Sequence, residues 1–254
     1  MGDLAREANG GLAMNSKPYI GITGITTLDQ VQNIIRIWDS LHCESHQLMM
    51  GFLYGYKELK GISHDNPRYC IYKGVLQSYL YLCGQKNIFR VIHYNTHNPY
   101  FAQEIIENFI DEKMDMDGFQ LNISNPNPTE VERLCEETQV ILQINHSLLS
   151  NLGELSKYKH PSYYLIDPSG GKGKSVDFEW LDWIINKINI PLNKIGIAGG
   201  LSPDNISEFA QRYSHCSFDA ESKLRTNDQL DIDKVKLYLN NFVNALQNIK
   251  KENS

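Results

Sequence analysis

Two glycine-rich segments are the parts of this sequence best suited to hold a phosphate group. They contain Gly170, Gly171 and Gly173 within D-P-S-G-G-K-G-K (167–174), and Gly199 and Gly200 within A-G-G-L-S-P-D-N (198–205). Glycines have no Cβ atom, so neighbouring backbone N–H groups can surround an oxyanion. Ser202 followed by Pro203 also predicts a helix start, which attracts anions. Each glycine pair alone is compatible with a simple turn, but the two together favour a phosphate site.

The elements that would position these segments follow a regular order along the chain. Short β-branched runs predict strands at 19–23, 47–53, 89–94, 118–122, 140–145, 163–167, 194–198 and 216–220. Amphipathic stretches predict helices at 28–41, 73–85, 99–112, 129–137, 147–156, 177–188, 203–212 and 231–249. This alternation predicts parallel strands joined by helical crossovers and no hairpins. The sequence therefore predicts an α/β protein with a single-domain (β/α)8 barrel over residues 19–250.

The barrel prediction gives the two glycine segments a common place. They follow the sixth and seventh predicted strands, and barrels often bind a substrate phosphate at these last loops. The long segment Tyr54–Tyr72 follows the second strand, so it is either a lid or substrate loop over the same face or a surface insertion. Residues 1–18 show no periodicity, and we expect a disordered leader or a remnant of cloning there.

Composition excludes several classes of partner. The chain has 24 Lys and Arg against 30 Asp and Glu, a net charge of −6, which argues against nucleic acid or an anionic membrane as a partner. Its 5 cysteines show no C-x-x-C spacing and predict reduced thiols in a cytoplasmic protein. No apolar run is long enough to span a membrane. Strand ends carry no His/Asp cluster, so we expect no metal and no cofactor. The oligomeric state stays open.

Short motifs accompany the predicted strands along most of the chain. They lie at 20–26 (I-G-I-T-G-I-T), 51–52 with 66–69 (G-F and N-P-R-Y), 91–95, 117–121 (D-G-F-Q-L), 164–178, 197–205 and 218–222 (F-D-A-E-S). In this order they resemble the motifs of the phosphoribosylanthranilate isomerase family, (β/α)8 enzymes of the tryptophan pathway. The resemblance implies the same barrel and a small phosphorylated, sugar-derived ligand.

The resemblance also implies roles for individual residues. The family catalyses an Amadori rearrangement of a phosphorylated ribosylamine, with a Cys in the first motif as general base and an Asp after the sixth strand as general acid. The acid falls on Asp167, and the arginine that holds the substrate carboxylate falls on Arg68. Gln120 and Asn122 fall beside the substrate, and Ser222 falls beside the phosphate with the five glycines.

Three positions depart from the family pattern. The family's catalytic Cys is Thr23 here, and a threonine hydroxyl has no useful pKa near neutrality. The family's His in Q-L-H-G is Asn122, and a Gly of the last motif is Lys223, which can serve an anion as a point charge.

An active enzyme would therefore need a replacement base. His93 and His146 lie near strand ends and histidine titrates near neutrality, although each also fits a packing or loop histidine. The sequence thus leaves two hypotheses: an aldose–ketose (Amadori-type) isomerase with an altered base, and a catalytically inactive homologue that binds a phosphorylated ligand in a regulatory or binding role.

Overall fold

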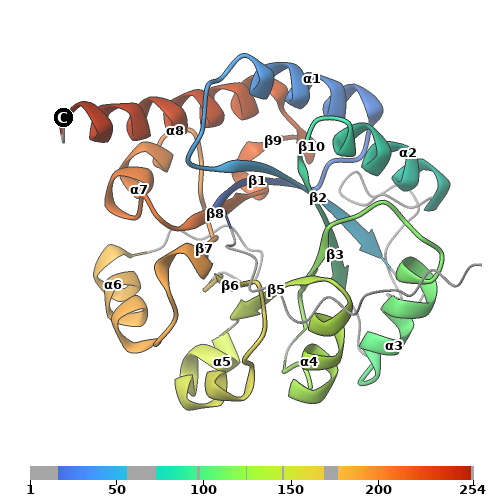
Figure 1. Cartoon of the computed structure of the whole chain (residues 1–254). Helices are drawn as coiled ribbons and strands as arrows, with labels where there is room; N and C mark the ends of the chain where they lie inside the picture. Colours follow the sequence, from blue (N-terminus) through green and yellow to red (C-terminus); the bar gives the residue numbers. More distant parts are fainter. Residues whose placement is uncertain are drawn as a thin grey trace, which may run out of the picture.

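The computed structural model describes residues 17–55, 73–95, 98–123, 125–144, 146–168 and 177–252. Its central feature is a closed barrel of parallel strands in the order β1 to β8, with β8 paired to β1 (Figure 1). The strands are β1 (Tyr19–Thr23), β2 (Gln47–Gly55), β3 (Phe89–Asn95), β4 (Gly118–Leu121), β5 (Gln139–Ile144), β6 (Tyr163–Ile166), β7 (Ile195–Ile197) and β8 (Ser217–Ala220). Each overlaps a predicted strand, and the predicted (β/α)8 barrel is confirmed.

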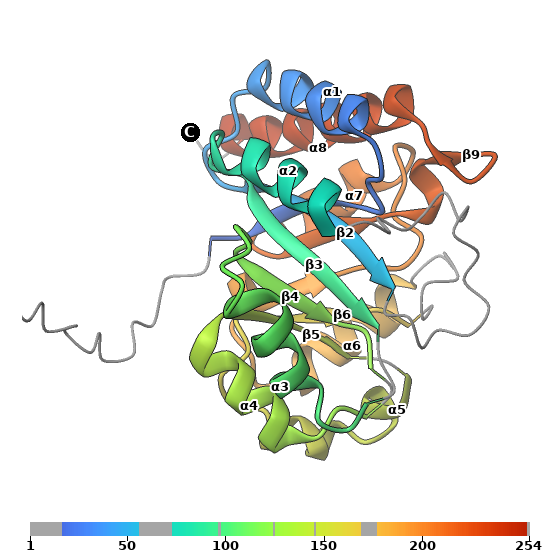
Figure 2. The ribbon, with the colours of Figure 1, turned by 90° about the vertical axis from the view of Figure 1, so that its right-hand side faces the viewer.

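Helices surround the barrel, as the side view in Figure 2 also shows. They are α1 (Leu28–Asp39), α2 (Lys73–Gly84), α3 (Phe101–Ile105) with the π-helix η1 (Ile106–Ile110), α4 (Pro128–Glu137), α5 (His146–Ser150) with the 3-10 helix η2 (Leu152–Lys157), α6 (Phe178–Lys187), η3 (Leu192–Lys194), α7 (Ile206–Arg212) and α8 (Ile232–Glu252). Helix α1 starts with a capping box, in which Thr27 accepts from the Gln30 backbone N–H and the Gln30 side chain accepts from that of Thr27.

Two predictions for the last third of the chain are wrong in detail. Helix α7 begins at Ile206 rather than at residue 203, because residues 202–205 form a turn. In that turn the side chain of Asn205 accepts from the backbone N–H of Ser202 (2.8 Å) and donates to the carbonyl of Gly200 (3.1 Å).

A hairpin also follows β8, where the alternation predicted none. It consists of β9 (Arg225–Thr226) and β10 (Gln229–Leu230), which pair antiparallel. Its two turn residues, Asn227 and Asp228, have φ of 50° and 61°, the conformation that a two-residue hairpin turn requires and that Asn and Asp tolerate.

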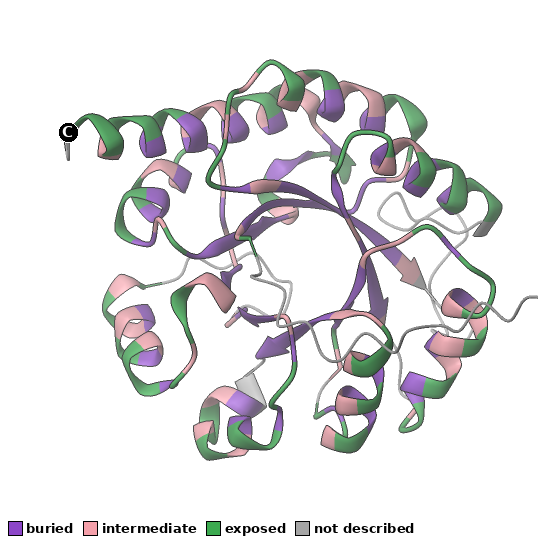
Figure 3. Cartoon of the chain, viewed as in Figure 1, coloured by how far each residue is buried: buried purple, intermediate pink, exposed green. Residues whose placement is uncertain are grey.

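Hydrophobic side chains pack on both faces of the strands. Figure 3 shows that the strands are buried, whereas the outer faces of the helices are exposed. The larger cluster lies between strands and helices. A smaller cluster fills the barrel interior, where the rings of Tyr19 and Tyr163 meet at 5.0 Å and Phe89 lies 5.9 Å from each. These aromatic residues stand at or near the first positions of β1, β6 and β3. They close the amino-terminal end of the barrel, so a pocket can form at the carboxyl-terminal end.

Some predictions fall partly outside the described residues. The expected leader is one, since residues 1–16 are not described. Lys17 and Pro18 are tied to the barrel, because the carbonyl of Lys17 accepts from the Tyr163 hydroxyl (2.7 Å) and that of Pro18 from the backbone N–H of Gln47 (2.9 Å). The expected lid or insertion is another: β2 continues to Gly55, and residues 56–72 lie outside the described part.

Two further observations concern the described ranges alone. No helix within them is long and apolar enough to cross a membrane. The four cysteines that these ranges include are free thiols, and Cys70 lies outside them.

Candidate active site

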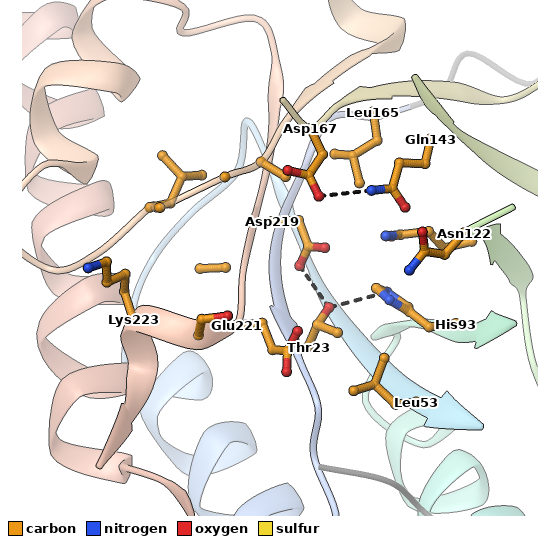
Figure 4. Close-up of a pocket in the computed structure, with 17 residues that line it drawn as sticks. Thr23, Leu53, His93, Asn122, Gln143, Leu165, Asp167, Asp219, Glu221 and Lys223 are labelled. Atoms are coloured by element: carbon orange, nitrogen blue, oxygen red, sulfur yellow. Dashed lines mark hydrogen bonds between the residues drawn. The ribbon is translucent and has the colours of Figure 1, made fainter. Parts of the chain in front are cut away.

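A pocket opens at the carboxyl-terminal end of the barrel, the end where (β/α)8 enzymes carry their active sites (Figure 4). It encloses about 550 Å³ including its open mouth. Its lining comes from strand ends and the loops after them: Thr23, Leu53, His93, Gln120, Asn122, Gln143, Leu165, Asp167, Ala198, Gly199, Gly200, Leu201, Asp219, Ala220, Glu221, Ser222 and Lys223.

Most of the predicted site residues that the structure describes lie on this one pocket. They are Thr23, His93, Gln120, Asn122, Asp167, Gly199, Gly200 and Ser222. Arg68, Gly170, Gly171 and Gly173 lie outside the described residues, and His146 begins helix α5 without a described side chain. The roles assigned to all of these residues stay predictions.

Three polar lining residues were given no role by the sequence analysis: Gln143 near the end of β5, Asp219 in β8 and Glu221 just after it. A local signal existed for the first two. Gln143 and Asp219 each lie between apolar residues within largely buried strands, and both are almost fully buried themselves. Successive side chains of a strand point to opposite faces of the sheet. A polar residue whose apolar neighbours pack against the helices therefore faces the barrel interior.

Asp167 is the first residue after β6 and is held in place from the neighbouring strand. The amide Nε2 of Gln143 donates to its Oδ2 at 2.8 Å, and the residue is 6% exposed (Figure 4). The amide oxygens of Gln143 and Gln120 are buried and have no hydrogen-bond partner within the described residues. Both amides line the pocket, so each offers an acceptor to a ligand hydroxyl or N–H group.

Thr23 joins two other strands of the barrel. Its hydroxyl donates to Oδ1 of Asp219 at 2.8 Å, and Nε2 of His93 lies 3.2 Å from the same oxygen (Figure 4). When Asp219 is ionised, it accepts the single hydroxyl hydrogen of Thr23, and the neutral ring of His93 then donates from Nε2. The result is a chain of hydrogen bonds from His93 through Thr23 to Asp219.

Glycines in the adjacent strands leave room for this chain. Gly51 is the register partner of Thr23, and a Cβ there would overlap Oγ1 of Thr23 and lie 2.9 Å from Nε2 of His93. Gly21 pairs with Asp219, and a Cβ there would lie 2.9 Å from its Oδ1. Any larger side chain at either position would push the polar groups apart.

Burial dominates the electrostatics of these groups. It raises the pKa of Asp219 to about 7; the hydrogen bonds from Thr23 and Gln120 oppose the rise, and the nearby charges of Glu221 and Asp167 add to it. Burial lowers the pKa of His93 to about 3, so its ring is neutral at pH 7. Within the described residues, no group of three or more His, Cys, Asp and Glu side chains could hold a metal ion.

The opposite side of the pocket suits an anion. Gly199 and Gly200 follow β7 with φ of 94° and 74°, a conformation that disfavours a side chain, and the Asn205 bonds described above fix their loop. Ser222 and the exposed Lys223 line this side from the short 3-10 helix η4 (Ser222–Leu224).

A buried arginine supports the same loops from outside the pocket lining. Arg225 donates to the carbonyls of Gly24 and Asp228, each at 2.8 Å, and its Nε lies 3.4 Å from Oε1 of Glu221. Gly24 has a φ of 81°, and a Cβ there would overlap the guanidinium group. The arginine thus links the ends of β1 and β8 and offsets one of the negative charges at the pocket.

Comparison with known proteins gives the family of this chain. A family model described as N-(5'-phosphoribosyl)anthranilate isomerase matches residues 103–241, more than half of the 254 residues. A protein of that name from Listeria welshimeri is 29% identical over 129 residues, which cover 49% of this chain and 60% of the relative. The match therefore spans less than two thirds of that relative's length.

Solved structures agree on the fold. A phosphoribosyl anthranilate isomerase from Thermotoga maritima has a TM-score of 0.62 at 18% identity, with 89% of this chain and 98% of that chain covered. Another, in complex with reduced 1-(o-carboxyphenylamino)-1-deoxyribulose 5-phosphate, has a TM-score of 0.63 at 16% identity, with 89% and 98% covered. Together with the family model, the barrel and its pocket show that the chain belongs to the N-(5'-phosphoribosyl)anthranilate isomerase family.

Proposed function

We propose that this chain isomerises a phosphorylated aldosylamine to the corresponding aminodeoxyketose, with Asp167 as the general acid. The observation that carries the proposal is the pair of buried carboxyl groups, Asp167 and Asp219, on one pocket at the carboxyl-terminal end of the barrel. An isomerisation by proton transfer needs one group that gives a proton and one that takes it. Two carboxyl groups in different environments can divide these tasks.

The rest of the pocket suits a phosphorylated sugar. Gly199, Gly200 and Ser222 line the side that suits an anion, and Lys223 adds a positive charge there. The amide oxygens of Gln120 and Gln143 offer acceptors for sugar hydroxyls. We further propose that Gly170, Gly171 and Gly173 complete the phosphate site and that Arg68 holds a second anionic group. A related isomerase binds a reduced aminodeoxyribulose 5-phosphate, which supports this ligand class.

The second candidate function is binding without catalysis. The observation in its favour is Thr23, which stands where the family has its catalytic Cys and whose hydroxyl proton is already given to Asp219. A chain of this kind would keep the phosphate ligand and perform no isomerisation.

The test compares the purified wild-type chain with Asp167→Asn on N-(5'-phosphoribosyl)anthranilate, with NMR following both the conversion and the exchange of the carbon-2 proton with solvent. Wild type should convert the substrate, and Asp167→Asn should lose about 10²–10⁴-fold in rate, the usual contribution of a general acid. Asp111→Asn is the matched control, since Asp111 is exposed at the end of η1.

The outcomes separate the two functions. The wild-type chain could bind reduced 1-(o-carboxyphenylamino)-1-deoxyribulose 5-phosphate and yet neither convert the substrate nor exchange its carbon-2 proton. This result would support a binding function and contradict the isomerase. Equal rates in wild type and Asp167→Asn would remove Asp167 from catalysis. Phosphate binding has its own measurement, a titration with inorganic phosphate followed on the backbone N–H signals of Gly199 and Gly200.

A further inference from the structure

We propose that Asp219 is the base that takes the carbon-2 proton in this reaction, and that Thr23 and His93 position it. This inference rests on the proposed isomerisation and adds the group that the sequence left unassigned. It moves the base from the first strand, where the family resemblance places it, to the last strand of the barrel.

Thr23 and His93 line the pocket but are unsuited to take the carbon-2 proton. A base must lie on the pocket and have a lone pair available. The Thr23 hydroxyl gives its proton to Asp219, and Nε2 of His93 must give its own to Thr23, so that nitrogen has no free lone pair. Burial also makes His93 a weak base, with a pKa of about 3.

The two remaining carboxyl groups are less suitable. Asp167 accepts from the Gln143 amide and is assigned to the acid step. Glu221 lies 3.4 Å from the guanidinium of Arg225, a cation that lowers the basicity of a carboxylate. Asp219 has no cation among its described contacts.

The surroundings of Asp219 suit a base that works near neutral pH. The residue is 7% exposed and lines the pocket beside Asp167 (Figure 4). Burial and the neighbouring charge of Glu221 disfavour its ionised form, which makes the carboxylate a stronger base than one in water. The hydrogen bonds from Thr23 and Gln120 fix the orientation of the carboxylate, which lines the pocket as the candidate proton acceptor.

The groups that face Asp219 determine how its charge responds to pH. They are Asp167 from β6, Glu221 after β8, His93 from β3 through Thr23, and the buried phenols of Tyr19 and Tyr238. Burial raises the pKa of both phenols well above 10, so they stay neutral. Asp167 and Glu221 are therefore the neighbouring groups whose charge can alter that of Asp219.

The chemical steps balance with these two carboxyl groups. Asp167 gives its proton to the ring oxygen, the bond from this oxygen to carbon 1 breaks, and the nitrogen lone pair forms the C=N bond. Asp219 then takes the carbon-2 proton; the electrons of that C–H bond form the bond between carbons 1 and 2 as a double bond, and the C=N electrons return to nitrogen. Carbon 1 next takes the proton from Asp219, while the enol hydroxyl gives its proton to Asp167 and becomes the ketone. Both groups end as they began.

The decisive experiment measures kcat, kcat/KM as a function of pH, and carbon-2 proton exchange in Asp219→Asn, Thr23→Val and Thr23→Ser. Asp219→Asn should lose about 10²–10⁴-fold in kcat and in exchange. Its affinity for inorganic phosphate should not fall, and it should unfold at no lower temperature, since the amide keeps an acceptor for Thr23 and removes a buried charge.

Thr23 tests the positioning role. Thr23→Val should lose about tenfold in kcat, the scale of a hydrogen bond to a charged group. It should also move the acidic limb of kcat/KM to higher pH, because the lost bond stabilised the ionised carboxylate. Thr23→Ser should restore both, and a purely structural threonine would not move the pH limb.

Each result bears on the proposal. Turnover by Asp219→Asn within tenfold of wild type would overturn the assignment of the base and leave the isomerase standing. A pH limb that Thr23→Val leaves in place would overturn the positioning role. Wild type without conversion or proton exchange would overturn both the isomerase and its base.

Discussion

The hydroxyl of Thr23 donates a 2.8 Å hydrogen bond to Oδ1 of Asp219 and so joins the ends of β1 and β8, where the barrel closes. The two residues are 196 positions apart in the chain. The family resemblance expects a thiol base at position 23. Here the residue at that position is instead a hydrogen-bond donor that orients a buried carboxylate.

Thr23→Cys should consequently give no gain in isomerase activity over wild type. The new thiol would be buried next to Asp219, and both the burial and the negative charge raise the pKa of a thiol. A thiol is also a weaker hydrogen-bond donor than a hydroxyl, so the carboxylate would lose orientation. Activity should fall below that of Thr23→Ser. The pH dependence of the reaction of this cysteine with a thiol reagent measures its pKa, and a variant faster than wild type would contradict the expectation.

Gly51→Ala should damage the site without any change to a polar side chain. The added methyl group would overlap Oγ1 of Thr23 and crowd Nε2 of His93, so the hydrogen-bond chain would separate. Overpacking of this kind costs about 1–3 kcal/mol in unfolding free energy, and kcat should fall together with it. Chemical denaturation and steady-state kinetics measure the two effects.

Gly74→Ala is the control for that variant. Gly74 lies in helix α2, and a Cβ there would meet nothing within 4 Å. Alanine is more favourable than glycine in a helix, so this variant should be at least as stable as wild type and fully active. Equal effects of the two substitutions on stability and kcat would show that steric conflict at residue 51 does not cause the loss in Gly51→Ala.

Much of this molecule could be predicted from short-range sequence patterns. The β-branched runs gave the strands, and their alternation with helices gave the barrel, because both depend on local periodicity. Asp167 was named as a site residue through the family resemblance, and the structure places it on the pocket. The motif order was specific enough to indicate the family.

Local patterns could not predict which side chains of distant strands come into contact. Which oxygen meets Thr23 depends on the register of β1 against both β8 and β2, and no local pattern sets these registers. The same holds for Gln143, whose amide reaches Asp167 across the β5–β6 pair. The late start of helix α7 follows from side-chain bonds of Asn205, which compete with the helix start that Ser202 and Pro203 predict.

A buried histidine outside the pocket should make stability depend on pH. His46 is 1% exposed, its Nε2 donates to the carbonyl of Cys216 at 3.0 Å, and its ring packs edge-on against Phe242. Burial lowers its pKa from 6.5 to about 4, which the hydrogen bond to Cys216 opposes. The unfolded chain therefore binds a proton at this residue below pH 6.5, and the folded chain does so only near pH 4.

Wild type should thus gain stability relative to His46→Gln as the pH rises from 4 to 6.5, by up to about 3 kcal/mol. Urea denaturation at a series of pH values measures this difference. The comparison is made between variants because the raised pKa of Asp219 has the opposite effect: its stabilising proton is lost as the pH rises through about 7. His42→Gln, at an exposed position, should show no such trend, and a parallel trend in both variants would contradict the role of His46.

Arg225 should matter for stability and for the geometry of the pocket together. Arg225→Met would remove the donors to the carbonyls of Gly24 and Asp228 and leave Glu221 without its cation. Arg225 is buried but Glu221 is only half-buried and 3.4 Å away, so most of the loss should come from the two carbonyls left without donors, about 1–3 kcal/mol for each unpaired buried group. Glu221→Gln in the same chain should recover part of this loss, whereas the lost bond to Gly24 should keep kcat low. Denaturation and kinetics of the single and double variants measure the two parts, and a double variant no more stable than Arg225→Met would show that the uncompensated charge of Glu221 does not contribute to the cost.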